Sequence, residues 1–427
     1  MTKHIYYRVT PLEPLIARDS RPFGEGGRAG VLEWLTPSLI AGALRTFLWE
    51  HGAQDASVLK RVAVSGGFPV YDERIYFPRP ADILMGKTPD AQERRIYQIR
   101  PIKIADGVIY DLPEADKGFI PSLAKDAPDD GFKPDSMASW WQSALLERWL
   151  DEGEQGAVAV TQDDFKEPAT LSPASKDIRV HVSVDPDTLT AAEGKLFSTT
   201  GLDLNRRARQ SDDDDEKQGR GKLGPTVQLS IRVDYDAEGL SDDVVKYLPI
   251  EFLLPLGGDR RAARFEQADD AALWGAYAKP NMQIDDQNHL LLRMVLATPA
   301  IFKGGWLPGW LSDGLCGKFP GTEIELKLVS AIVNRWDPVS GWDYVVGKPK
   351  PLRRMAPAGS VYFFEVVADP KHQLREGNTE TGAFDFSELW LRSCCDDEQD
   401  RRDGFGLTLW GTWFDSRDRD NVEKENK

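Results

Sequence analysis

Four glycine-rich loops hold the residue types in this sequence that could do chemistry. They lie at residues 18–28, 256–261, 302–308 and 404–407, with basic or aromatic residues within or beside them. Glycine lets a backbone adopt positive φ, and consecutive exposed N–H groups then form a concavity that binds anions. A neighbouring arginine or lysine adds charge, and an aromatic ring can stack on a nucleobase. One such loop alone is better explained as a tight turn. Because four such loops occur, a binding surface becomes as good an explanation as a set of turns.

Familiar catalytic motifs do not appear in the sequence. Residues 256–260 lack the Gly-Lys-Ser/Thr ending of a Walker loop, and neither HExxH nor Gly-x-Ser-x-Gly occurs. No GxGxxG run lies between an expected strand and an expected helix. The five histidines are isolated from one another, and a lone histidine is usually structural. His181 is the best candidate for a general acid or base, because it is expected on the polar face of a strand.

The charge of the chain argues against an isolated RNA-binding domain, because phosphate contacts favour a basic surface. The sequence has 53 basic and 69 acidic residues, a net charge of −16. The charges are unevenly distributed, however. Acidic runs at 212–216 and 396–400 are expected in solvated loops rather than in a metal site, and basic clusters lie at 206–209, 260–264 and 348–354. Patches rather than totals decide local binding, so RNA is not excluded.

The bulk composition predicts a soluble, intracellular protein of two or three domains. The 427 residues contain no apolar run of the length that crosses a membrane, and the start does not resemble a signal peptide. The three cysteines form no CxxC pair and have no clustered histidines beside them. We therefore expect reduced thiols, no zinc site, no cofactor, no membrane partner and a cytoplasmic location.

Strands and helices that could position the loops are visible as local patterns. Residues 4–17 predict a strand, and residues 36–51 predict a helix with Thr36 as N-cap and Pro37 in its first turn. A second helix is expected from residue 135 or 136 to 150, with its tryptophans in the core. Alternating residues at 176–204 predict two strands joined by the turn at 185–188.

The C-terminal part repeats this pattern weakly. Strands are expected at 289–299, 361–367 and 405–413, and the loop at 302–308 follows its strand as the loop at 18–28 follows the first. The prediction is an α+β fold of two ferredoxin-like βαββαβ modules with insertions, including a β-hairpin. We place the modules at residues 1–285 and 286–427.

An ordered set of motifs then resembles a known family. The chain is similar to the RAMP (repeat-associated mysterious protein) superfamily of CRISPR systems, and most closely to the third subunit of the type III-B Cmr effector complex. The resemblance covers nearly the whole chain. Its supporting stretches are residues 11–15, 21–24, 37–46, 181–185, 193–199, 256–261, 347–351, 357–364 and 404–407.

The resemblance implies a non-catalytic role in antiviral defence. Such subunits bind the repeat-derived 5′ tag of the guide RNA. They also contact the large polymerase/cyclase-like subunit and the first backbone subunit. A β-hairpin, which we map to residues 176–200, wedges near the boundary between tag and spacer. The residues expected to contact RNA are Arg21, Phe23, Gly24, Ser38, Arg45, Arg179, His181, Gly257, Gly258, Arg260, Arg261, Lys303, Lys348, Lys350, Gly404 and Gly406.

Two alternatives stay open at this point. One is a RAMP-type endoribonuclease that processes guide RNA, with His181 in a metal-independent reaction. The other is the equivalent subunit of another type III complex. The acidic runs at 212–216 and 396–400 match no pattern of the family.

Overall fold

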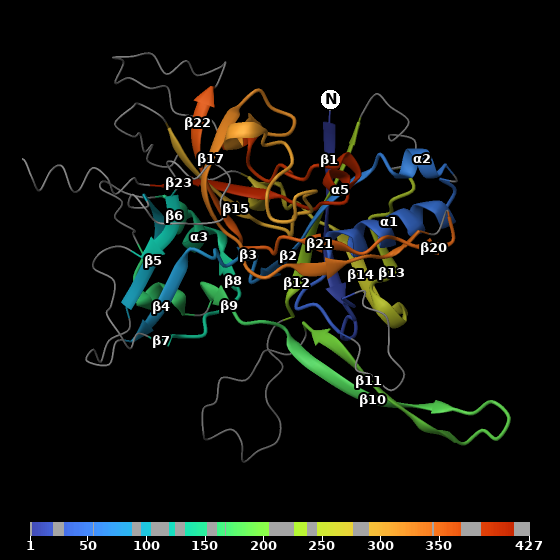
Figure 1. The fold of residues 1–427 in the computed structure, drawn as a ribbon. Helices are drawn as coiled ribbons and strands as arrows, with labels where there is room; N and C mark the ends of the chain where they lie inside the picture. Colours follow the sequence, from blue (N-terminus) through green and yellow to red (C-terminus); the bar gives the residue numbers. More distant parts are fainter. Residues whose placement is uncertain are drawn as a thin grey trace, which may run out of the picture.

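The fold is taken from a computed structural model (Figure 1). It describes residues 2–19, 30–53, 55–87, 95–103, 119–123, 133–151, 160–166, 168–204, 226–236, 246–275, 290–343, 346–368 and 386–413. Arg21, Phe23, Gly24, the acidic run at 212–216 and the expected boundary near residue 285 lie outside these ranges.

An eight-stranded antiparallel sheet dominates the N-terminal half. Its strand order is β13-β14-β1-β12-β2-β3-β8-β9. The first strand ends at Pro11, earlier than the expected residue 17, because the chain then turns away to meet other segments. The bounds are β1 Thr2–Pro11, β2 Ala63–Tyr71, β3 Arg74–Pro78, β8 Trp140–Gln142, β9 Thr170–Leu171, β12 Gln228–Asp236, β13 Glu251–Pro255 and β14 Ala262–Gln267.

Helix α1, Pro37–Glu50, packs on this sheet and confirms the helix expected there. Thr36 is the N-cap residue and Pro37 begins the helix, as the sequence predicts. Its apolar face buries Ile40, Leu44 and Leu48 in the core of the N-terminal half, together with residues of β1, β2 and β12. A short helix, α2 (Ala56–Leu59), follows it.

The second expected helix begins later than predicted. Helix α3 spans Ser143–Leu150, and residues 140–142 form strand β8 instead. The prediction of a helix from 135 or 136 was wrong there because these residues pair with the edge of β3, Trp141 lying opposite Phe77. Trp141 and Trp149 are fully buried, so the expected core role of the tryptophans is confirmed.

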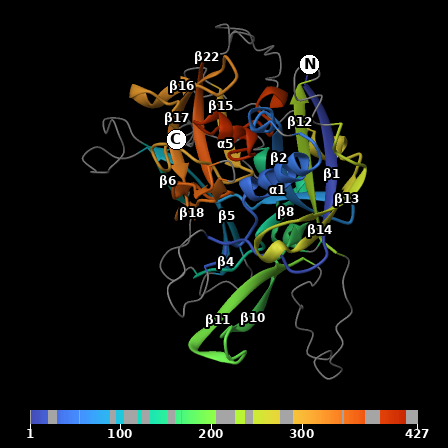
Figure 2. The same ribbon diagram turned by 90° about the vertical axis from the view of Figure 1, so that its right-hand side faces the viewer.

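Two smaller β structures are inserted into the N-terminal half (Figures 1 and 2). A four-stranded sheet has the order β6-β5-β4-β7, and the expected hairpin is confirmed as β10 paired with β11. The hairpin projects away from the rest of the molecule in both views. The bounds are β4 Ile83–Lys87, β5 Arg95–Lys103, β6 Phe119–Leu123, β7 Lys133–Pro134, β10 Ser175–Val184 and β11 Ala191–Asp203.

The C-terminal half is built on a five-stranded antiparallel sheet with the order β16-β17-β22-β15-β23. The three strands expected here are present: β15 and β23 are shorter than expected, and β22 extends one residue beyond the expected end. Helix α5, Glu398–Arg402, precedes the last strand. The bounds are β15 Leu291–Leu296, β16 Cys316–Lys318, β17 Glu325–Ile332, β22 Val361–Ala368 and β23 Thr408–Thr412.

A two-stranded ribbon, residues 333–356, leaves the C-terminal sheet after β17. It consists of β18 (Asp337–Val339) paired with β21 (Arg353–Met355), and farther out β19 (Trp342–Asp343) paired with β20 (Lys348–Pro349). We refer to residues 333–356 as the basic ribbon, because five basic residues outnumber two acidic ones in it.

One hydrophobic cluster joins the two halves. It packs Phe68 and Trp149 of the N-terminal half against Val295, Phe363 and Trp413 of the C-terminal half. Arg293 on β15 crosses the same junction, donating a hydrogen bond to Asp82 and another to the backbone oxygen of Trp149. The halves are therefore held face to face by a shared core and a buried ion pair.

Candidate functional site

Two of the predicted RNA-binding segments meet beside the end of β1. The backbone of Leu15 exchanges hydrogen bonds with Leu202 at the base of the hairpin, with N–O distances of 2.9 and 2.7 Å. Gly258 donates its N–H to the backbone oxygen of Ile16 at 2.9 Å. Gly257 has φ +87°, and a Cβ there would lie 2.7 Å from the Ile16 oxygen, so the close approach requires glycine.

The two arginines of this loop have different surroundings. Arg261 is held by Glu13, whose carboxylate also accepts the N–H of Ala262 at 3.0 Å. Hydrogen bonding to Arg261 and Ala262 lowers the pKa of Glu13, and the nearby charge of Arg179 on the hairpin adds to this shift. Arg260 is exposed and forms no ion pair within the described residues. Arg260 is thus the cation of this loop that a phosphate could reach directly.

The predicted hairpin residues lie together on one face. Arg179 pairs with Asp177 at 2.7 Å, and His181 shares a hydrogen bond of 2.8 Å with the Thr199 hydroxyl. The His181 ring stacks on Phe197 with centroids 5.1 Å apart. The opposite face carries Ile178, Val180, Val182 and Leu196, all exposed. The projecting hairpin is therefore amphipathic, with an uncovered apolar face.

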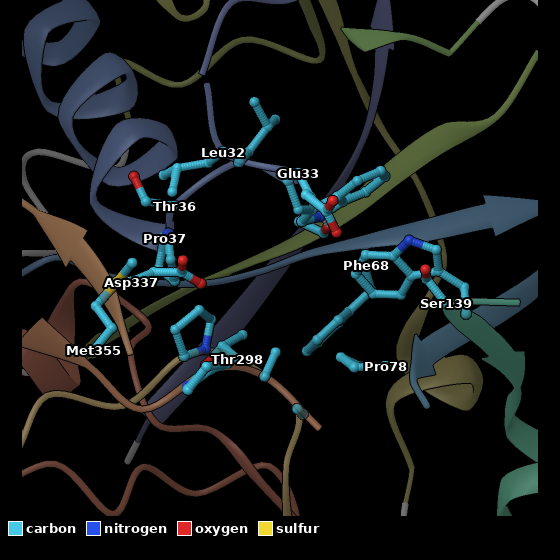
Figure 3. A pocket seen from close by; sticks show the side chains of 18 of the residues that line it. Leu32, Glu33, Thr36, Pro37, Phe68, Pro78, Ser139, Thr298, Asp337 and Met355 are labelled. Atoms are coloured by element: carbon cyan, nitrogen blue, oxygen red, sulfur yellow. Dashed lines mark hydrogen bonds between the residues drawn. The ribbon is translucent and has the colours of Figure 1, made fainter. Parts of the chain in front are cut away.

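A cleft of about 450 Å³ lies between the two halves, which we refer to as the central cleft (Figure 3). Thr36 and Pro37 at the start of α1 lie on one side, Phe68 and Ser139 lie across from them, and Thr298 belongs to the C-terminal half. Asp19, within the first glycine-rich loop, and Val31, three residues after its end, also line the cleft. The first predicted loop therefore leaves and re-enters the fold at this cleft.

The start of α1 provides the cleft with backbone donors. No side chain caps the helix N-terminus, and its first turn contains no acidic residue. Unsatisfied N–H groups and the helix dipole make such an end favourable for anions. Ser38, a predicted contact, lies in this first turn with its hydroxyl 3.4 Å from that of Thr36.

Arg79 is a cation in the cleft that sequence reasoning did not select. Its Nε is buried without a hydrogen-bond partner, and its nearest polar contact is the Met137 sulfur, 4.0 Å from Nη1. Burial lowers the pKa of Arg79, with the charge of Asp82 opposing the shift. No carboxylate within the ranges given above forms an ion pair with it. An anionic ligand would supply the missing partner.

Aromatic residues and a glycine bulge shape the other wall. Trp34 packs against Trp140 with ring centroids 4.5 Å apart and ring planes tilted by 54°, and its Nε1 donates to the backbone oxygen of Gly67 at 2.9 Å. The pairing of β2 with β12 shifts register at Gly66–Gly67, where both glycines have positive φ. Three acidic residues, Asp19, Glu33 and Asp337, also line the cleft, so its charge is mixed.

The C-terminal glycine loop supports the floor of the cleft rather than facing its opening. Gly404 and Gly406 are buried, with φ +87° and +67°. The N–H of Gly406 donates to the Pro299 oxygen at 2.8 Å, and the Thr298 hydroxyl donates to the Gly404 oxygen at 2.8 Å. Thr298 and Pro299 line the cleft, so the two glycines bonded to them hold the floor of the cleft in position.

Arg45 is occupied by protein groups. Its guanidinium forms an ion pair with Asp403 and donates to the backbone oxygen of Val62 at 2.9 Å. This contact joins α1 to the segment after α5, across the two halves. The structure therefore gives Arg45 a role in bridging the two halves, and its guanidinium is already bound to protein groups.

The acidic run at 396–400 is structural, which corrects the expectation of a solvated loop. Asp396 accepts the N–H groups of Lys303 and Gly309 at 2.8 and 2.7 Å, and Asp397 caps α5. Asp400 is buried and forms a bidentate pair with Arg353. The backbone donors of the predicted loop at 302–308 are thus partly taken by the chain's own carboxylate, while the Lys303 side chain stays exposed.

The basic ribbon presents the remaining predicted residues. Lys348 and Lys350 are exposed on its outer part, and the backbone of Lys350 is tied to Gly341 and Ser340. The base of the ribbon lines the central cleft through Asp337 and Met355. The structure therefore forms three groups: the hairpin base with the 257–261 loop, the central cleft, and the basic ribbon.

The described residues form neither a metal site nor a helix that could span a membrane. No three histidine, cysteine or acidic side chains among them gather in a way that could hold a metal ion. None of the helices in the described ranges is long and apolar enough to span a bilayer. All three cysteines are free thiols, and Cys394 and Cys395 are buried.

Comparisons with known proteins give distant structural similarities and one family match. No curated protein matches the chain. Two solved chains come from cryo-EM structures of the type III-B Cmr-beta complex bound to cognate target RNA, one of them also with AMPPnP. Each is 15% identical, with a TM-score of 0.40, covering 84% of this chain and 86% of the other. A chain of the Csm3–Csm4 subcomplex in the type III-A CRISPR–Cas interference complex is 9% identical, with a TM-score of 0.34, covering 86% and 94%.

The family of the chain is shown by its match to a family model. The model described as CRISPR-associated protein (Cas_Cmr3) matches residues 7–413, which include every described strand of both main sheets except the start of β1. The family expected from the ordered motifs is thereby confirmed. The chain belongs to the Cas_Cmr3 family of CRISPR-associated proteins.

Proposed function

We propose that the chain is a non-catalytic RNA-binding subunit of a type III CRISPR effector complex. In this role it binds the 5′ tag of the guide RNA and anchors the large polymerase/cyclase-like subunit and the first backbone subunit. The observation that carries the proposal is the family match over residues 7–413. The geometry supports it, because the hairpin base and the 257–261 loop meet beside the end of β1, and the start of α1 lines the central cleft.

The central cleft is the proposed grip on the tag. It combines an uncapped helix N-terminus, the unpartnered Arg79 and the two flanks of the first glycine-rich loop. A single-stranded tag can splay its bases, so a phosphate at Arg79 and the start of α1 is compatible with a base beside Trp34. Arg260 and the hairpin base extend the basic surface beyond the cleft.

The hairpin is the proposed wedge between tag and spacer. Its exposed apolar face, with Val180 at 65% exposure, is not covered by any of the described residues. Apolar side chains inserted between bases unstack them, which is a known way to interrupt a nucleic acid stack. The face with Arg179 and His181 would then meet the backbone.

We also propose that each half is a ferredoxin-like module. In the N-terminal sheet β14-β1-β12-β2 are neighbours, and in the C-terminal sheet β23-β15-β22-β17 are neighbours. Taken as strands of one module each, both series run fourth, first, third, second, all antiparallel, as a βαββαβ unit does. The equal order also supports the weak internal repeat. Helix α1 fills the first crossover in the N-terminal half.

The absence of catalysis is part of the proposal. His181 hydrogen-bonds to Thr199 and stacks on Phe197, and no second histidine or carboxylate of the described residues bonds to its ring. A metal-independent ribonuclease needs both a base and an acid at the scissile bond. Incubation of the purified chain with repeat RNA in EDTA tests this. Cleavage that is lost in His181→Ala would contradict the proposal and favour a processing endoribonuclease.

Tag binding is tested by titrating the chain with single-stranded RNA that carries the tag. We expect Arg79→Gln and Arg260→Glu each to weaken binding about 10-fold or more, since charge-assisted hydrogen bonds contribute about 1.5–3 kcal/mol. Arg264→Glu, on the exposed surface of β14, is the matched control and should change affinity less than about 2-fold. Equal affinities for all three variants would remove these surfaces from the interface.

The partners are tested by co-purification from the native host. We expect a short RNA with a fixed 5′ end, together with one large partner and one smaller subunit. The identity of these partners also separates a Cmr complex from another type III complex.

A further inference from the structure

A second hollow lies where the C-terminal half meets β6 of the inserted four-stranded sheet, whose Ile120 and Pro121 also line it. It encloses about 540 Å³ and shares only Asn334 with the lining of the cleft. One wall is the loop with Gly304, Gly305 and Trp306, and the other is the base of the basic ribbon. We refer to it as the tryptophan groove.

Two tryptophans in the groove remain open to solvent. Trp306 is 36% exposed and Trp336 is 44% exposed. By contrast, Trp141, Trp149, Trp410 and Trp413 of the same chain are fully buried core residues. An exposed indole is an apolar surface that a flat ligand can cover.

The groove is basic although the chain is acidic. Arg335 and Arg354 line it, and no aspartate or glutamate does. Both arginines are exposed, and neither forms an ion pair within the part of the chain that the structure describes. The Arg354 guanidinium lies 4.8 Å from the centre of the Trp336 ring. A cation and an aromatic ring are thus already stacked beside each other.

A buried hydroxyl without a partner lies in the wall. Ser330 on β17 is 3% exposed, and its Oγ has no hydrogen-bond partner. Leaving a buried polar group unsatisfied is costly, so such a group indicates a missing ligand. The pairing of β17 with β22 shifts register between Leu328 and Ser330. Such an irregularity changes the direction of the side chains in this wall of the groove.

We propose that the tryptophan groove binds an unpaired nucleobase of a single-stranded RNA. A base stacks on Trp336 or on the Arg354 guanidinium, Trp306 covers its edge, and Arg335 contacts the adjoining phosphate. The Ser330 hydroxyl bonds to a polar atom on the edge of the base. The inference rests on the proposed RNA-binding function and adds a stacking site outside the central cleft. The two arginines favour a polyanion over a proline-rich peptide, which an aromatic groove could otherwise accept.

The test uses the full chain and a fluorescently labelled single-stranded RNA of mixed sequence. We expect Trp336→Ala and Trp306→Ala each to weaken binding about 5-fold or more, as base–aromatic stacking predicts. Trp49→Ala is the matched control, because Trp49 on α1 is 44% exposed, as Trp336 is, but lines neither the groove nor the central cleft. It should stay within about 2-fold of the original chain. Circular dichroism of each variant checks that it is folded.

A second arm separates charge from stacking. Arg335→Gln should flatten the dependence of log Kd on log salt by about 0.7, the value for one phosphate of a single strand, while the tryptophan variants leave the slope unchanged. An abasic RNA should bind the original chain and Trp336→Ala with similar affinity. A free mononucleotide should bind far more weakly than the strand, since it lacks the neighbouring phosphate.

The outcomes distinguish this site from the proposed function. If Trp336→Ala and Trp306→Ala bind RNA like the original chain while Arg79→Gln binds weakly, the groove is not a base site and tag binding stands. If the tryptophan variants alone lose affinity, the groove is supported and the central cleft is not. Equal binding of mononucleotide and strand, or saturable binding of a proline-rich peptide in place of RNA, would overturn the groove proposal.

Discussion

The ion pair between Arg293 and Asp82 offers the sharpest test of how the two halves are held together. Both side chains are fully buried, with 2.7 Å between Arg293 Nη1 and Asp82 Oδ2. Trp149 donates its Nε1–H to the other oxygen of Asp82 at 2.9 Å. Asp82→Asn keeps the shape of the side chain but removes the carboxylate that pairs with the buried guanidinium.

The expected cost follows from this burial. Removing one partner of a buried pair costs about 3–5 kcal/mol, whereas replacing both partners with apolar residues is often neutral. We therefore expect Asp82→Asn to lower the free energy of unfolding by about 3–5 kcal/mol. The double variant Asp82→Ala/Arg293→Met should recover most of that loss, because no charge is left buried.

Urea denaturation, followed by tryptophan fluorescence and circular dichroism, measures these changes. The control is Glu323→Gln, which removes an exposed pair with Lys318 and should change stability by less than about 1 kcal/mol. A loss below about 1 kcal/mol in Asp82→Asn would refute the reasoning. So would a double variant whose loss equals the sum of the two single losses.

Two further predictions concern thiols and glycine. Burial raises the pKa of Cys395 to about 12 and that of Cys394 well above its usual value, so both stay protonated at pH 8. An alkylating reagent should then modify only the half-buried Cys316 quickly, with all three thiols reacting in denaturant, as mass spectrometry would report. Gly404→Ala should destabilise the fold by more than about 1 kcal/mol in thermal unfolding, since its Cβ would lie 2.5 Å from the Val64 oxygen. Gly347→Ala, which has positive φ but open space around it, should cost less.

Local sequence patterns were sufficient to predict elements that are stabilised mainly by contacts between residues close in sequence. Thr36 and Pro37 mark the start of α1, and the apolar spacing that follows gives its length. The alternation at 176–184 gives the first strand of the hairpin. The stretch at 140–142 reads equally well as helix, and only its pairing with β3, about 60 residues earlier, makes it a strand. The family resemblance found the correct class where composition alone did not.

The partners of the candidate site residues could not be predicted from the sequence. Arg261 meets Glu13 across 248 positions, and Arg45 meets Asp403 across 358. Arg79 has no local feature that marks it; its isolation appears only when residues from both halves surround it. Arg335 and Trp336 were likewise unselected, because a single Arg-Trp pair in a sequence is common. Which arginine side chains have an ion-pair partner is decided by contacts between residues that are far apart in the sequence.

Several donors in the predicted RNA-binding segments are already bound by carboxylates of the chain itself. This affects how well the chain would distinguish one RNA from another. Glu13, Asp396 and Asp403 already hold Arg261, the 303–309 backbone and Arg45. An arbitrary cellular RNA must displace them to reach those donors, and it gains little for doing so, because a net charge of −16 repels it at longer range. Under the proposed function, only a strand that also fits the cleft would offset that cost. The chain's own acids would then act as competitors that keep bulk RNA away from the proposed tag site.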